Sequence, residues 1–86
     1  MHEYVVETYL ARGRASDFRD AVARAQAATA ALGDVSWVRS TFVDADELCL
    51  HWFTAPSLQA VREAAERARI NCDRVVTAET IDEEAR

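Results

Sequence analysis

Cys49 and His51 are the residues of this chain whose types and spacing could do chemistry. They lie two positions apart in the run DELCLHWFTAPS (46–57), so on a strand their side chains would share one face. Imidazole, thiolate and carboxylate groups bind borderline first-row metals such as nickel or zinc. His51, Cys49 and Glu7 are therefore the predicted metal ligands, although a histidine beside a cysteine on a strand is more often a packed core or interface residue.

Composition excludes several classes of protein. Half of the 86 residues are apolar and 29% are charged, which is typical of a folded globular chain. The ten cations are scattered arginines among fifteen acids, so we expect no nucleic-acid partner. The N-terminal run MHEYVVE lacks the basic segment and apolar core of a signal peptide, and no apolar run could span a membrane, so a cytoplasmic location is expected.

Residue patterns predict four strands and two helices. Strands are expected over 3–10, 35–43, 48–54 and 73–81, where β-branched and aromatic residues gather, with DADE (44–47) as a hairpin turn. The first helix should run from Ser16 to the stop signal Gly33, and the second should open at Pro56 and Ser57 and end near Ile70 and Asn71. Residues 1–81 are predicted to form a single domain, and residues 82–86 an acidic C-terminal tail.

The order β-α-β-β-α-β predicts an α+β, ferredoxin-like fold, a four-stranded antiparallel sheet with two helices on one face. Alternation along the strands then assigns residues to the two faces of that sheet. The helix-covered face is predicted to carry Tyr4, Val6, Leu10, Leu48, Leu50, Trp52, Val76 and Ala78. The open face is predicted to carry Val5, Glu7, Tyr9, Glu47, Cys49, His51, Phe53, Val75, Thr77, Glu79 and Ile81. The face assignment of strand 35–43 stays ambiguous.

An open face of this mixed character is best explained by a homodimer that packs sheet on sheet. Glu7, Cys49, His51 and Glu79 would then converge near its centre, because the first and third strands are neighbours in this fold. A small ligand held there would contact Tyr9, Phe53 and Glu79, which are the predicted ligand-binding residues.

Several runs together resemble a known family. They are EYVVETYL (3–10), STFVDADE (40–47), FTAPSLQAVREAAERA (53–68) and DRVVTAETI (73–81). In this order they resemble small ferredoxin-like domains of unknown function whose best-described members are nickel-binding proteins. The likeness covers nearly the whole chain, and it implies nickel or another divalent transition metal as a cofactor.

The ligand pattern of the nickel-binding branch is largely missing. That branch implies an Asp-x-His near the end of the first strand, a histidine in each helix, and a cysteine shortly before Glu-Ala-Pro. Here the first strand reads ETY, neither helix contains a histidine, and His51 and Thr54 stand at the cysteine and glutamate positions. The chain therefore more closely resembles the branch that lacks those ligands.

Two classes of function remain open at this point. The first is a small dimeric binding or sensing module that holds a transition metal or a small ligand. The second is a small cofactor-free enzyme of the dimeric α+β barrel kind, similar to monooxygenases or cyclases, with His51 as acid or base and Glu7 orienting it. A purely structural dimer without a site is the simplest alternative. The binding module is preferred, because the sequence contains no nucleophile motif, oxyanion device or phosphate loop.

Overall fold

The computed structural model describes residues 1–81 and gives them a β-α-β-β-α-β order. The strands are β1 (His2–Tyr9), β2 (Ser36–Val43), β3 (Leu48–Ala55) and β4 (Arg74–Ala78), and the helices are α1 (Ala15–Leu32) and α2 (Leu58–Arg67). A short 3₁₀ turn, Asp44–Asp46, joins β2 to β3. The predicted acidic tail, residues 82–86, lies outside the described residues.

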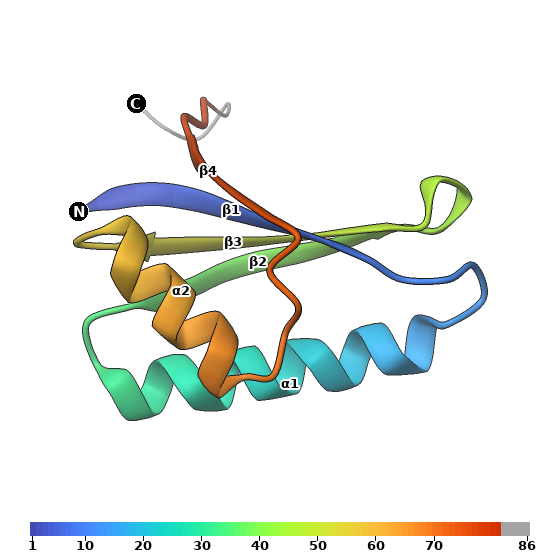
Figure 1. Cartoon of the computed structure of the whole chain (residues 1–86), viewed down its shortest axis with the longest axis horizontal. Helices are drawn as coiled ribbons and strands as arrows, with labels where there is room; N and C mark the ends of the chain where they lie inside the picture. The colour runs from blue at the N-terminus through green and yellow to red at the C-terminus, as the bar shows by residue number, and fades with distance from the viewer. Residues whose placement is uncertain (82–86) are drawn as a thin grey trace.

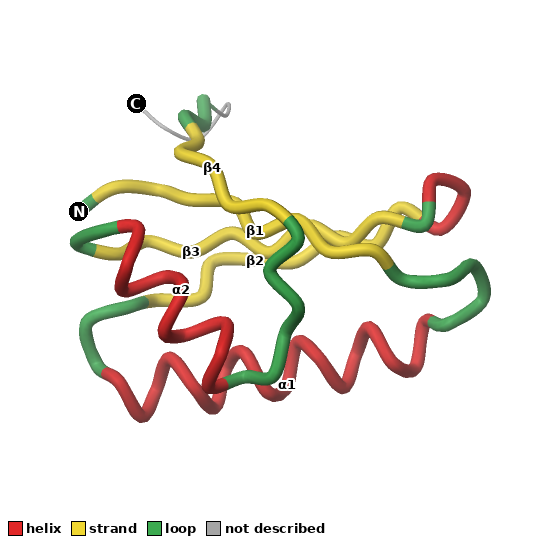
Figure 2. Tube along the Cα trace, in the orientation of Figure 1, coloured by secondary structure: helices red, strands yellow, loops and turns green. Residues whose placement is uncertain are grey.

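The four strands form one antiparallel sheet in the order β2-β3-β1-β4. Both helices pack on the same side of this sheet, as Figure 1 shows, with α2 beside α1. The tube in Figure 2 shows that, within residues 1–81, no helix or strand covers the other side of the sheet. The predicted ferredoxin-like architecture, with β1 and β3 as central neighbours, is confirmed.

Local signals in the sequence correctly marked the end of α1 and the start of α2. The other two ends differ from the prediction, because α1 begins at Ala15, before the expected Ser16, and α2 ends at Arg67, before the expected Ile70 and Asn71. Gly33 closes α1 in the left-handed conformation, with φ 82°, and its N–H donates to the carbonyl oxygen of Thr29. Ser57 caps α2 through its hydroxyl oxygen, which accepts from the N–H of Ala60 at 3.2 Å. Strand β4 is shorter than predicted, so Glu79 and Ile81 follow the strand instead of belonging to it.

The core lies between the sheet and the two helices. On the helices its residues are mostly alanines, and the larger core side chains stand on the strands. The contributors from the helices and from the residue after α2 are Ala25, Ala28, Val61, Ala64, Ala65 and Ala68. The strands contribute Tyr4, Val6, Phe53 and Ala55, among which Phe53 and Val6 are almost fully buried.

The predicted face assignment of β3 and β4 is wrong. Val6, which lies under the helices, pairs with His51 and with Val75, and directly opposed residues share a face of a sheet. Cys49, His51 and Phe53 therefore face the helices. The open face instead carries Val5, Glu7, Tyr9, Leu48, Leu50, Trp52, Val76 and Ala78. The error arose because both sets of alternating side chains on β3 are largely apolar. Alternation alone could therefore not show which set faces the helices.

A bulge explains the ambiguous pattern of β2. Trp37 pairs with Phe53, but Arg39 pairs with Trp52, so Val38 is an extra residue that shifts the alternation. Trp37 before the bulge and Ser40 after it consequently both face the helices. A single alternating pattern therefore does not describe the whole strand, which explains why its face assignment was ambiguous from the sequence.

Among residues 1–81, no helix combines the length and the apolar character that crossing a bilayer requires.

Candidate functional site

His51 is the buried polar side chain around which the candidate site is built. Its exposed fraction is 0%, although it lies on the central strand β3 among apolar neighbours. The ring of Phe18 from α1 stacks on the imidazole with ring centroids 6.2 Å apart. A polar ring at such a position requires hydrogen-bond partners, because an unpaired buried polar atom is costly.

Strand β2 supplies a partner for one nitrogen of His51. The hydroxyl oxygen of Ser40 lies 2.6 Å from Nδ1 of His51, and it also accepts from the indole N–H of Trp37 at 2.9 Å. The single hydroxyl proton of Ser40 can then be donated to Nδ1. This arrangement favours the tautomer with the ring proton on Nε2, because the hydroxyl proton of Ser40 then has an acceptor in Nδ1.

Nε2 of His51 has no hydrogen-bond partner among residues 1–81. In that tautomer it is a buried donor without an acceptor in the described part of the chain. Leaving such an atom unpaired costs about 1–3 kcal/mol, so its presence calls for an explanation.

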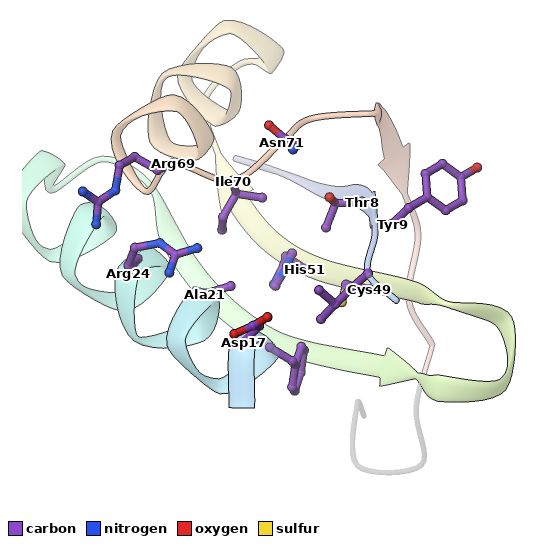
Figure 3. A pocket seen from close by; sticks show the side chains of 12 residues that line it. Thr8, Tyr9, Asp17, Ala21, Arg24, Cys49, His51, Arg69, Ile70 and Asn71 are labelled. Atoms are coloured by element: carbon purple, nitrogen blue, oxygen red, sulfur yellow. The ribbon is translucent and has the colours of Figure 1, made fainter. Parts of the chain in front are cut away.

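A cavity of about 160 Å³ adjoins His51. Figure 3 shows its lining, which comes from the end of β1, from α1, from β3 and from the segment after α2. Phe18, Ala21 and Ile70 give this cavity apolar walls, while Arg24 and Asn71 add polar groups. A small apolar chamber with a few polar groups is the usual form of a ligand site.

Arg24 sets the electrostatics of the cavity. Its Nε donates to the carbonyl oxygen of Ala68 at 2.8 Å, and this hydrogen bond links α1 to the residue that follows α2. Burial, and secondly the positive charge of Arg24, lower the pKa of His51 from 6.5 to about 4. The imidazole is therefore neutral at pH 7.

Cys49 lies next to this cavity and is 2% exposed. Burial raises the pKa of its thiol, so the neutral form is favoured and the metal-binding thiolate is disfavoured. Glu7, the third predicted ligand, lies on the opposite face of the sheet and pairs with Arg74 at 3.7 Å. Within one subunit the sheet thus separates Glu7 from His51.

The donor set does not fit a nickel ion. Nowhere in residues 1–81 do three His, Cys, Asp or Glu residues come close enough together to hold a metal. A divalent cation at Nε2 would also face the guanidinium charge of Arg24. The assignment of His51, Cys49 and Glu7 as metal ligands stays a prediction, with these observations against it.

The three predicted ligand-binding residues lie apart from one another. Tyr9 is at the rim of the cavity, but it is 71% exposed, and Figure 3 shows its ring directed away from His51. Phe53 is 1% exposed and belongs to the core. Glu79 is exposed beyond the end of β4. Of these three residues, the structure brings Tyr9 alone to the lining of the cavity.

Sequence reasoning missed Arg24 and Ser40. Arg24 follows Phe18 and Ala21 at intervals of three, so it lies on the apolar stripe of α1, where an arginine is unexpected. An arginine on this stripe could have indicated a functional role for Arg24 from the sequence. Ser40 gave none, because the bulge in β2 hid the face on which it lies.

The family described as "Nickel responsive protein SCO4226-like" matches residues 4–77 of this chain. No curated protein and no solved structure matches the chain.

Proposed function

Because the chain belongs to the family of nickel responsive proteins described as SCO4226-like, we propose that it is a small binding or sensing module whose ligand occupies the cavity beside His51. The observation that carries this proposal is the unpartnered Nε2 of a fully buried histidine at the wall of that cavity. A bound group that accepts from Nε2 would satisfy the atom and recover the cost of its burial.

Binding is favoured over the acid-base alternative by the charge state of His51. A pKa of about 4 makes the imidazole a weak base at pH 7, whereas an effective general base has a pKa near the working pH. Glu7, which was expected to orient the ring in an enzyme, lies on the other face of the sheet. Ser40 holds the ring instead.

We also propose that two copies of the chain pack through their open sheet faces. Val5, Leu48, Leu50, Trp52 and Val76 share this face, and a sheet face with this apolar content is normally covered. The half-buried Glu7, opposite Leu50 on the central strand β1, would be enclosed in such an interface, and its ion pair with Arg74 would offset the charge of its carboxylate. The cavity lies on the helix side, so ligand binding would not require the interface.

The experiment uses four benzene derivatives of similar size: benzoate, benzamide, benzyl alcohol and benzylamine. Binding is followed by nuclear magnetic resonance through the imidazole signals of His51 and the amide signal of Ala21. We expect at least one compound to shift both signals in a saturable way. Ala21→Leu should abolish the shifts by filling the cavity, whereas Ala27→Leu, at an exposed position on the same helix, should not.

The absence of saturable shifts with all four compounds would overturn the proposed site. Nickel is tested separately by calorimetry on the wild type, His51→Ala and His2→Ala. Specific binding that is lost in His51→Ala alone would restore the metal prediction. Binding lost in His2→Ala would indicate an adventitious site at the exposed N-terminal histidine.

A further inference from the structure

Two kinds of N–H donor border the cavity beside His51. The first is the Nε2–H of His51, in the tautomer that the hydrogen-bond chain through Ser40 and Trp37 favours. The second is the guanidinium of Arg24. Because its Nε is bound to the carbonyl oxygen of Ala68, the plane of the group is fixed, and its Nη atoms remain for another acceptor. Figure 3 shows the guanidinium of Arg24 extending toward the side of the cavity where His51 lies.

The remaining charged groups around the cavity leave Arg24 without a counter-charge. Asp17 lines the cavity, but its carboxylate is engaged by Arg14 through an ion pair and a hydrogen bond from Nε at 2.7 Å. Arg69 is exposed, and Figure 3 shows its guanidinium directed away from His51. In the described part of the chain, no carboxylate lies within ion-pair distance of Arg24.

The size and walls of the cavity limit what can enter. A dry cavity of about 150 Å³ in another protein binds benzene, so about 160 Å³ accommodates a compact body of similar size. Phe18, Ala21, Leu10 and Ile70 offer apolar contact to such a body. Arg24 and His51 would then receive its polar end.

We propose that this cavity selects a small carboxylate of about six to ten non-hydrogen atoms, with one apolar end and one anionic end. The carboxylate oxygens would accept from the guanidinium of Arg24 and from Nε2–H of His51, and the apolar body would pack against Phe18 and Ile70. This inference rests on the proposed function and names the class of ligand. A planar carboxylate suits the fork of donors that a guanidinium presents.

The four compounds described above also test this inference. On the wild-type protein at pH 7, benzoate should bind at least about tenfold more tightly than benzyl alcohol or benzamide, because a charge-assisted hydrogen bond contributes at least that factor. Benzylamine, which has a similar body and the opposite charge, should not bind, since it would face Arg24. This comparison requires no variant.

Arg24→Gln should weaken benzoate binding by about tenfold or more and leave the affinity for benzyl alcohol within about twofold of the wild type. Arg19→Gln is the matched control, because Arg19 lies on the same helix, is exposed and does not line the cavity. Arg24→Lys retains the positive charge but lacks the paired N–H donors of a guanidinium. Its affinity for benzoate should therefore lie between those of the wild type and Arg24→Gln. Circular dichroism checks that each variant is folded.

Equal affinities for benzoate and benzyl alcohol would overturn the carboxylate assignment and leave the binding module intact. Benzoate binding that Arg24→Gln and Arg19→Gln reduce equally would also overturn it, because a general charge effect would then explain the preference. Failure of all four compounds would overturn both the module and its ligand class.

Discussion

At the scale of single residues, His51 couples the site to folding. Its pKa is about 4 in the folded chain and about 6.5 in the unfolded chain, so the unfolded state takes up a proton over a range in which the folded state does not. The stabilising effect of neutral His51 is complete above pH 6.5 and is lost as the pH falls toward 4.

We therefore predict that lowering the pH from 7 to 4 reduces the free energy of unfolding by about 3 kcal/mol through this residue. Urea unfolding across the range measures the effect, and His51→Gln should remove this part of the dependence. Equal slopes for the wild type and His51→Gln between pH 4 and 6.5 would contradict the prediction.

Ser40 is predicted to hold His51 in one tautomer. Ser40→Ala removes the partner of Nδ1 and also the acceptor for the indole N–H of Trp37, so we expect a loss of about 1–3 kcal/mol in unfolding free energy. The nitrogen chemical shifts of His51 should change at the same time. Ser36→Ala, at an exposed position of the same strand, should cost less than about 0.5 kcal/mol. A mixed tautomer in the wild type would count against the proposed hydrogen-bond chain.

At the scale of elements, the fold places the cavity where β1, α1, β3 and the segment after α2 meet. Helix α1 contributes Phe18, Ala21 and Arg24 from one stripe, so the orientation of this helix sets the shape of the chamber. The contact from Arg24 to the carbonyl oxygen of Ala68 links that helix to the end of α2. Movement of either helix would therefore change the cavity.

The end of α1 gives a direct test at this scale. Gly33→Ala should destabilise the chain by about 1–2 kcal/mol, since a Cβ is disfavoured at φ 82°. A Cβ at this position would meet nothing within 4 Å, so the cost is one of backbone conformation and not of packing. Gly33→Asn should cost less, because asparagine tolerates the left-handed region. Thermal melting compares the two, and equal losses would point to a cause other than backbone conformation.

At the scale of the whole molecule, the open sheet face is the large surface without a covering element in residues 1–81. Leu50 lies near its middle, between Glu7 on β1 and Thr41 on β2. Dimerisation through this face would remove Leu50 and Trp52 from water in both copies at once.

Leu50→Glu should convert the predicted dimer to a folded monomer, because it places a charge in each half of an apolar interface. Light scattering measures the mass, and circular dichroism checks the fold. Ala27→Glu, on the exposed side of α1, is the matched control and should leave the dimer intact. A wild-type monomer at micromolar concentration would contradict the dimer and leave the cavity unaffected.

The fold is predicted to need no structural metal. Its core is filled by apolar side chains from both helices and from the strands, and such a core does not depend on ligation. EDTA should therefore leave the melting temperature of the purified protein unchanged. A marked drop on chelation would show that a metal contributes to folding.

The order of the elements, the end of α1 and the start of α2 could be predicted from the sequence. Strand-forming runs, the apolar stripe of α1, Gly33 and Ser57 are local signals, since each acts through the conformation of a few neighbouring residues. The family likeness carried by the order of these segments is confirmed by the match over residues 4–77.

The side of the sheet on which His51 lies was decided by the tertiary structure. Leu48, Leu50 and Trp52 could form a core face as well as Cys49, His51 and Phe53, so the sequence of β3 is compatible with either orientation. Pairing of Val6 with His51 fixed the choice, because it joins strands that are far apart in the sequence. The same pairing separated Glu7 from His51 and turned His51 toward Arg24 on α1, while the pairing of β2 with β3 placed Ser40 opposite it. For this reason the chemistry of the site could not be derived from residue types and spacing alone.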